Sequence, residues 1–189
     1  MKKITILFIL LLFVLQSKAQ NIVAVEKAVD YWDAGTGIPV GTYLKDINNL
    51  FAPYVGTWKG TINNKTYTFF ITKITESSNG RIVDKLIIYH TIFDHTVGYI
   101  IEDSRIGKAR PHITGRFFQK DLAYYVLTYI GQNSKCGRNG EVFIKKASAT
   151  TMLLKLSAYG EVGDVRRCPG GQKEVQVLPT ESFVTLTKQ

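Results

Sequence analysis

Histidine, cysteine and long apolar runs are all scarce in this chain of 189 residues. The three histidines, His90, His95 and His112, show neither the His-x-His nor the His-x-x-x-His spacing by which one strand or helix supplies two metal ligands. The sequence also lacks a Gly-x-Ser-x-Gly nucleophile elbow and a glycine-rich loop placed to bind a dinucleotide. We therefore expect no metal site and no cofactor.

Nothing in the sequence points to an enzyme. Nucleophilic hydrolysis needs a nucleophile, a base and an orienting group, and no motif groups these residue types here. The adjacent carboxylates Glu102 and Asp103 would point to opposite faces of a strand, so we interpret them as surface charge at a strand end. The sequence favours a non-catalytic role without deciding the question.

The long apolar run that does exist lies at the N-terminus. Two lysines precede an apolar stretch over residues 4–15, and Ser17 and Ala19 are small residues where a signal peptidase cuts. The stretch is shorter than the roughly 20 residues that span a bilayer. The pattern predicts a signal peptide over residues 1–19 and export to the periplasm or the cell exterior, with no membrane-spanning segment left after cleavage.

The chain is basic, with a net charge of +9 at pH 7, but its lysines and arginines are spread along the sequence. Nucleic acid recognition requires basic residues gathered on one surface together with aromatic side chains. We therefore expect no nucleic acid partner.

The two cysteines, Cys136 and Cys168, lie in glycine-rich segments. In an oxidising compartment two cysteines most often pair, so a disulfide between them is expected. Such a bond closes a loop of about 33 residues and stabilises the fold by roughly 3–4 kcal/mol on the chain-entropy model. A metal site and a reactive thiol are the alternatives, and two cysteines without neighbouring histidines are a poor ligand set.

From Gly56 onward apolar residues recur with a period of two, which predicts a single β-domain over residues 56–189. Asn63-Asn64, Asn79-Gly80 and Asn139-Gly140 are residue types that accept the positive φ of two-residue hairpin turns. Connections this short leave no room for crossover helices, so the sheet should be antiparallel and up-and-down. The expected strands are 56–62, 65–75, 81–92, 97–103, 111–118, 122–131, 141–147, 151–158, 172–178 and 182–188.

Residues 20–55 form an N-terminal segment of mixed character. Residues 23–30 fit one or two helical turns, and the apolar spacing over residues 44–51 predicts a short amphipathic helix that ends before Pro53. Several later stretches, such as 86–93, are apolar on both faces of a strand. Their outer faces need cover, from this segment or from a partner.

The sequence Tyr54-Val-Gly-Thr-Trp58, placed between a short helix and a β-meander, resembles the opening of lipocalin-like (calycin) barrels. The matching residues are Gly56 and Trp58. The resemblance implies an all-β, antiparallel up-and-down barrel of about 8–10 strands, with a short N-terminal helix closing one end. It also implies that Trp58 packs under the barrel floor against a basic side chain, for which Lys188 and Lys155 are candidates.

The segment 39–60 looks more closely like a family of small exported proteins of unknown function from Gram-negative bacteria. That similarity would cover nearly all of the exported chain. It implies no activity.

Aromatic residues on the expected strands suggest a ligand cavity, because a tyrosine combines an apolar ring with a polar tip. They can equally well simply fill the barrel. Arg116 would meet an anionic head group if it points inward with His112 and Thr114, and would be a solvated cation if it points outward. The candidate lumen residues are Tyr67, Phe69, Tyr99, Arg116, Tyr124 and Val126.

Two functional hypotheses follow. The first is a non-enzymatic, exported barrel that binds a small apolar or amphipathic molecule. The second is a cell-envelope interaction protein that uses the barrel as a scaffold, in which the strands that are apolar on both faces mark a surface for a partner.

Overall fold

The computed structural model describes residues 20–106, 111–131, 136–159, 165–173 and 175–189. The expected signal peptide, residues 1–19, lies outside the described residues. Within the described part of the chain, none of the helices is both long and apolar enough to cross a membrane.

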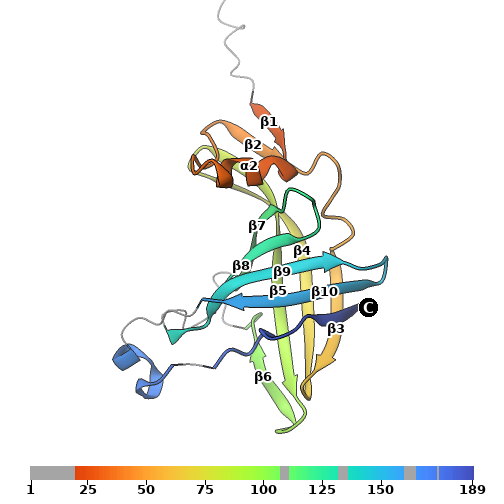
Figure 1. The fold of residues 1–189 in the computed structure, drawn as a ribbon, viewed down its shortest axis with the longest axis vertical. Coiled ribbons are helices and arrows are strands. Elements are labelled where there is room, and N and C mark those ends of the chain that lie inside the picture. The colour runs from red at the N-terminus through yellow and green to blue at the C-terminus, as the bar shows by residue number, and fades with distance from the viewer. Residues whose placement is uncertain (1–19, 107–110, 132–135, 160–164, 174) are drawn as a thin grey trace, which may run out of the picture.

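Eight antiparallel strands close into a barrel (Figure 1). Each strand pairs with its neighbour along the chain, the last strand returns to the first, and β5 pairs with β7 to complete the wall. The expected all-β, up-and-down barrel is therefore confirmed. The barrel strands are β3 (Gly56–Ile62), β4 (Lys65–Ser78), β5 (Arg81–Asp94), β7 (Ile113–Phe118), β8 (Tyr125–Ile130), β9 (Asn139–Lys146), β10 (Thr151–Ala158) and β11 (Val184–Lys188).

Strand β5 shares its second edge among three partners. Its start pairs in parallel with β2 (Thr42–Lys45), Ile87 and Ile88 pair with β7, and its end pairs with β6 (Tyr99–Asp103). Among the described residues, β7 thus meets β5 at only two register positions. We call this short junction between β5 and β7 the seam, because β5 pairs with β2 on one side of it and with β6 on the other.

The N-terminal segment adds a small parallel unit at one end of the barrel (Figure 1). It consists of β1 (Asn21–Ala24), a 3-10 helix η1 (Val25–Lys27), the helix α2 (Ala28–Asp33) and β2, which joins β1 to β5. The helical residues thus fall where the sequence indicated one or two turns. The parallel pairings were not expected from the sequence.

The prediction of an amphipathic helix over residues 44–51 is wrong. These residues complete β2 and then form turns, in which the Asp46 carboxylate accepts hydrogen bonds from the backbone N–H groups of Leu50 (2.7 Å) and Phe51 (3.3 Å). Asn49 has a φ of 54°. A carboxylate that caps later N–H groups, followed by a left-handed residue, favours turns over a helix. The apolar spacing instead reflects Leu44 and Phe51 entering the core.

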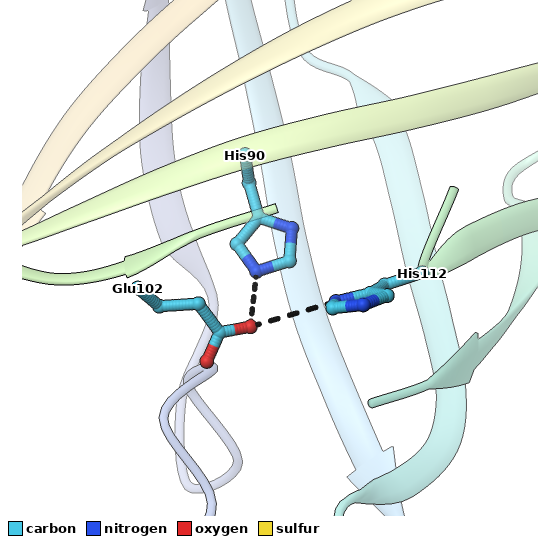
Figure 2. Close-up of side chains that lie close together, drawn as sticks. All are labelled: His90, Glu102 and His112. Carbon is cyan, nitrogen blue, oxygen red and sulfur yellow. Dashed lines mark hydrogen bonds and ion pairs between the residues drawn. The ribbon is translucent and has the colours of Figure 1, made fainter. Parts of the chain in front are cut away.

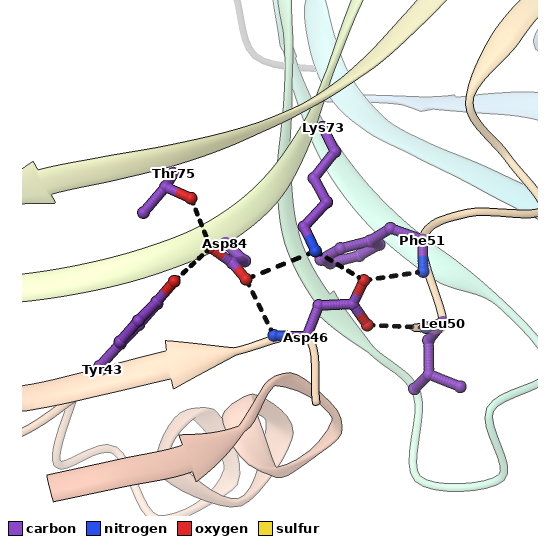
Figure 3. Close-up of polar contacts among 7 residues, drawn as sticks. All are labelled: Tyr43, Asp46, Leu50, Phe51, Lys73, Thr75 and Asp84. Carbon is purple, nitrogen blue, oxygen red and sulfur yellow. Dashed lines mark hydrogen bonds and ion pairs between the residues drawn. The ribbon is translucent and has the colours of Figure 1, made fainter. Parts of the chain in front are cut away.

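A buried ionic network fastens this segment to the barrel (Figure 3). The Lys73 ammonium lies 3.0 Å from an Asp46 carboxylate oxygen and 3.5 Å from one of Asp84, and both carboxylates are buried. Burial tends to raise the pKa of Asp84. Hydrogen bonds from Thr75, the Asp46 N–H and Tyr43, with the charge of Lys73, outweigh burial and hold that pKa below its usual value.

The predicted hairpin turns are confirmed at two of three places. Asn63 and Asn64 have φ values of 49° and 57°, and Asn79-Gly80 also has positive φ at both residues. The turn expected at Asn139-Gly140 is wrong, because both residues belong to β9. A Cβ on Gly140 would lie 2.3 Å from the carbonyl oxygen of Ser157, so this glycine permits a close approach of two strands.

The strand expected over residues 172–178 is also wrong for the residues that the structure describes there. They follow the 3-10 helices η3 (Val165–Arg167) and η4 (Pro169–Gly171) and then run beside the end of the β3–β4 hairpin. Leu178 is buried against the core, and Leu156 N–H donates to the carbonyl oxygen of Pro179. This segment therefore covers a barrel end instead of adding a strand.

The Gly-x-Trp motif lies at the start of β3, away from the β3–β4 hairpin, and organises the packing there. Trp58 is fully buried, and its indole N–H donates to the Tyr54 carbonyl oxygen over 2.7 Å. The ammonium groups of Lys146 and Lys188 lie 4.1 and 5.5 Å from the Trp58 ring centroid, whereas Lys155 lies over Phe183. The prediction of a basic partner for Trp58 is therefore confirmed for Lys188 and wrong for Lys155.

Gly56 explains why a glycine precedes the tryptophan. Its φ is 130°, which side-chain-bearing residues rarely adopt, and a Cβ there would lie 3.1 Å from Cε of Lys188. The glycine thus leaves room for the lysine that reaches Trp58.

The expected disulfide between Cys136 and Cys168 is confirmed, with a Cα–Cα distance of 5.6 Å. It joins the residues just before β9 to the short helices η3 and η4, and both cysteines are buried. The bond therefore ties two loops together, as the glycine-rich surroundings of the cysteines indicated.

Candidate functional site

A groove of about 830 Å³ lies on the outer side of the seam. Strands β4 and β5 form one wall and β7 and β8 the other, and Trp32 of α2 adds an aromatic ring. The groove exists because β4 and β5 continue past the point where β7 leaves β5. Its apolar lining residues are Trp32, Ile74, Ile87, Pro111 and Ile130, and its ionisable ones are Glu76, Lys85, His112 and Arg116.

Strand alternation directs these side chains outward. On β5, Asp84, Leu86 and Ile88 are buried inside the barrel, so the intervening Lys85 and Ile87 face the groove. The Lys85 ammonium lies 2.5 Å from a Glu76 carboxylate oxygen, and half of the Glu76 side chain is exposed. The Lys85 side chain is largely buried, but because Glu76 is half in solvent this ion pair is weak, and a ligand anion can replace Glu76 as the partner of Lys85.

Arg116 occupies a β-bulge. Gly115 pairs with Leu127 and Phe117 pairs with Val126, so Arg116 is the extra residue between them. Its guanidinium carbon lies 4.2 Å from the Trp32 ring centroid, and the guanidinium also forms an ion pair with Glu141. The bulge and the stacked ring hold this cation at the groove in a fixed orientation.

Gly115 is required for the bulge to pack. A Cβ at Gly115 would lie 2.1 Å from the Tyr125 hydroxyl oxygen and 2.9 Å from the Leu86 carbonyl oxygen. Tyr125 fills this space inside the barrel, and burial raises the pKa of its phenol well above the usual value. The wall behind Arg116 is therefore tightly packed.

At one end of the groove, His112 belongs to a cluster with Glu102 and His90 (Figure 2). Nε2 of His90 lies 2.9 Å from Oε1 of Glu102, and Nδ1 of His112 lies 3.8 Å from the same oxygen. Arg138 forms an ion pair with the other oxygen, Oε2. The cluster thus leads from the outer groove to His90, which is fully buried in the barrel.

Strands β5 and β6 and the residue just before β7 supply the cluster. His90 occupies an inward position of β5, and its ring lies among those of Phe69 and Tyr129, with centroid distances of 6.0 and 6.3 Å. Glu102 comes from β6, where a register shift at Ile92/Phe93 interrupts the pairing with β5. Its carboxylate is only 10% exposed, so the interpretation of Glu102 as surface charge is wrong.

Two hydrogen bonds between His90 and Ser104 fix β6 beside His90. The His90 N–H donates to the Ser104 hydroxyl oxygen over 2.7 Å, and the Ser104 N–H donates to the His90 carbonyl oxygen over 2.8 Å. Imidazole nitrogens and a carboxylate oxygen are ligands for a divalent metal, and a carboxylate–imidazole pair can also transfer a proton. No sequence spacing signalled this cluster; the only hint was a histidine within an apolar strand.

Only some of the predicted lumen residues point into the barrel. Tyr67 and Phe69 point into the barrel and are buried. Tyr99 lies on β6 and is 60% exposed, and Arg116 is directed outward by its bulge. Placement in the lumen is therefore wrong for these two. Whether any of the predicted residues contacts a ligand stays a prediction.

The same correction applies to Tyr124 and Val126. The inward side chains of β8 are Tyr125, Leu127 and Tyr129, so the alternation is offset by one position from the one assumed. Tyr124 packs outside against Phe143 and Phe183, and Val126 is paired with Phe143. These residues cover the outer face of the sheet.

The fold defines a closed, eight-stranded antiparallel β-barrel protein with a polar cluster at its seam. The chain belongs to a family of unknown function, DUF6705, whose model matches residues 1–122. No curated protein and no solved structure matches the chain. The matched residues include the Gly-x-Trp motif and the whole His90–Glu102–His112 cluster, but the family carries no assigned activity.

Proposed function

We propose that the protein binds a small amphipathic molecule with an anionic group, in the groove outside the barrel seam. The observation that carries this proposal is the lining, in which Lys85 and Arg116 flank an apolar strip that contains Ile87 and Ile130. The volume of about 830 Å³ falls within the roughly 300–1,000 Å³ of small-molecule sites.

Arg116 is the residue proposed to recognise the anionic group. A guanidinium offers five N–H donors in a plane and binds a carboxylate through two of them. Trp32 already holds that plane, so little side-chain entropy remains to be lost on binding. The apolar part of the ligand would lie along Ile87 and Ile130.

The proposed site differs from the lumen that the sequence suggested. Inward residues such as Phe69, Leu86 and Leu127 are fully buried against one another in the core. An interior packed in this way favours a ligand on the outer side of the wall.

Isothermal titration calorimetry tests the proposal. We expect dodecanoate to bind and dodecyltrimethylammonium, which carries the opposite charge on the same chain, to bind much more weakly. Arg116→Ala should weaken dodecanoate binding by about 10- to 100-fold, because a charge-assisted hydrogen bond contributes roughly 1.5–3 kcal/mol.

Arg105→Ala is the matched control. Arg105 also stacks on an aromatic ring, that of Phe70 at 4.8 Å, and pairs with Asp103, but it does not line the groove. Equal affinity for the two detergents, or an equal loss in the two arginine variants, would contradict the proposal.

We also propose that the protein is exported, on the basis of the predicted signal peptide. The Cys136–Cys168 disulfide supports this, because such bonds persist in oxidising compartments. N-terminal sequencing of the protein from its own host should give Gln20 as the first residue. Intact Met1 on a cytoplasmic protein would contradict export.

A second candidate function, a scaffold for a partner, is supported by β6. Val97, Tyr99 and Ile100 are all exposed near this strand, and β6 pairs with β5 alone among the described strands. An exposed apolar edge strand can add a strand from another protein. If Ile100→Lys abolishes a complex seen by size-exclusion chromatography in host extract while dodecanoate binding is absent, this function is favoured over the first.

A further inference from the structure

We propose that His90, Glu102 and His112 together bind one divalent transition-metal ion, with Zn²⁺ as the expected ion. Two imidazole nitrogens and one carboxylate oxygen form the protein ligand set of many zinc sites that keep a fourth position open. All three side chains are directed toward one point from three separate segments of the chain (Figure 2). The site does not depend on the groove ligand proposed above.

The two distances to Glu102 suit a zinc ion after a small adjustment. The three ligand atoms lie within 4.8 Å of one another, and the two distances to Oε1 of Glu102 are 2.9 and 3.8 Å. Zinc bonds of about 2.0–2.1 Å in a tetrahedron separate ligand atoms by roughly 3.3 Å. One pair is thus slightly closer than this separation and one slightly wider, each by about half an ångström. The third pair, the two imidazole nitrogens, lies within 4.8 Å and would have to close by up to about 1.5 Å.

The ligands inside the barrel wall are held more rigidly than His112 at its surface. His90 is fully buried on β5, and its two hydrogen bonds with Ser104, one to the serine hydroxyl and one from the serine N–H, hold the end of β6, with Glu102, beside it. His112 precedes β7 and is 20% exposed on the groove side. Two ligands are therefore positioned in advance, and the third can close on the ion.

Arg138 supplies the outer support and also limits the affinity. Its guanidinium pairs with Oε2 of Glu102, so that Oε1 is the oxygen facing both imidazoles. Outer partners of this kind orient metal ligands, but a nearby cation also opposes a second positive charge. We therefore expect a dissociation constant on the order of micromolar, weaker than that of structural zinc sites.

The groove gives the ion a route to the cluster. His112 lines the groove, so an ion can arrive from solvent, and the fourth position can hold water or an anionic oxygen. Without a metal, the same residues form an ionic network in which Glu102 bridges Arg138 and His90. The experiment must separate these two roles.

The test uses the full mature protein after removal of metals with EDTA and dialysis. Titration with Co²⁺ should produce the visible absorption bands of four-coordinate cobalt, and Zn²⁺ should remove them at one equivalent per chain. Calorimetry with Zn²⁺ alone gives the affinity, and the melting temperature should rise on adding Zn²⁺. No groove ligand is present, so failure here is distinct from failure of the proposed function.

His112→Ala is the informative variant, because His112 is the most exposed of the three ligands and its loss should leave the barrel folded. It should weaken Zn²⁺ binding by at least about 100-fold, more than the 10- to 100-fold typical of an outer-partner change. His95→Ala is the matched control, since His95 lies on an exposed turn and its ring contacts Thr66 and Phe93.

Circular dichroism checks that both variants keep the β-barrel spectrum. Wild-type protein that binds no zinc at about 1 mM would overturn the proposal. It would also be overturned by an unchanged affinity in folded His112→Ala, or by an equal loss in His95→Ala.

Discussion

The guanidinium of Arg116 stacks on the ring of Trp32, with 4.2 Å between the guanidinium carbon and the ring centroid. This contact joins the bulged strand β7 to the N-terminal helix α2, which are far apart in the chain. It gives the groove both its aromatic wall and its fixed cation. The N-terminal segment is therefore part of the proposed binding site as well as a cover for the barrel.

Replacing Trp32 separates these two roles. Trp32→Ala should lower the free energy of unfolding by only about 1 kcal/mol, because the lost contact is a partly exposed cation–π pair. Binding of dodecanoate should fall at least tenfold, since Arg116 loses the ring that orients it. Trp32→Phe retains a ring and should bind nearly as well as the wild type. Urea unfolding and calorimetry provide the two readouts, and a large stability loss without a binding loss would argue against this account.

Lys73 should matter far more for stability. It lies between the buried carboxylates of Asp46 and Asp84, so Lys73→Met leaves two negative charges close together without a cation. We expect a loss of about 2–3 kcal/mol in urea unfolding, below the 3–5 kcal/mol of a fully buried pair because a third of the Lys73 side chain is exposed.

Lys85→Met provides the comparison for that measurement. Lys85 pairs with the half-exposed Glu76, whereas the carboxylates beside Lys73 are buried, and an ion pair with one partner in solvent contributes about 0–1 kcal/mol. If both methionine variants lost the same stability, the buried network of Figure 3 would not be what fastens the N-terminal segment.

Acid should unfold the protein partly through Asp94. A hydrogen bond from the Lys65 ammonium and one from the Thr96 N–H lower the pKa of Asp94 to about 2. The unfolded value is about 3.9, so the stabilisation is complete above that pH and is lost as the pH falls toward 2. Asp94→Asn should therefore show a smaller drop in stability than the wild type between about pH 4 and pH 2. Parallel pH curves for the two proteins would contradict this assignment.

Reduction of the disulfide should weaken the fold without removing it. Cys136 and Cys168 are separated by 32 residues, and neither belongs to a barrel strand. Reduced protein should lose roughly 3–4 kcal/mol of unfolding free energy. It should keep its β-sheet circular dichroism spectrum at room temperature. A Cys136→Ser/Cys168→Ser variant should match the reduced protein, and a fully unfolded variant would show that the bond is essential for the fold.

The barrel could be predicted because its signals are local. Asn63-Asn64 and Asn79-Gly80 adopt the positive φ that their residue types suggest, and Gly56 and Trp58 mark the first strand. The predictions are wrong where tertiary contacts, and not the local sequence, decide the backbone conformation. Asp46 turns an apolar, helix-like spacing into capped turns, and Gly140 serves a close strand approach instead of a turn.

The site was less accessible to sequence reasoning. A single bulge at Arg116 and an offset of one residue on β8 reverse which side chains face outward, and periodicity cannot reveal either feature. The cluster residues His90, Glu102 and His112 are distant along the chain. They come together because one edge of β5 pairs first with β7 and, further along, with β6. His112 and Arg116 were correctly considered together, but they line the outer groove.

The most direct test of the seam as the functional site is a titration of ¹⁵N-labelled protein with dodecanoate, followed by backbone amide shifts in NMR spectra. We expect the largest shift changes at Ile87, Arg116 and Ile130, which line the groove, with little change at Phe69 and Leu127 in the barrel interior. The largest changes at Phe69 and Leu127, with the groove residues unmoved, would place the ligand in the lumen and contradict the account.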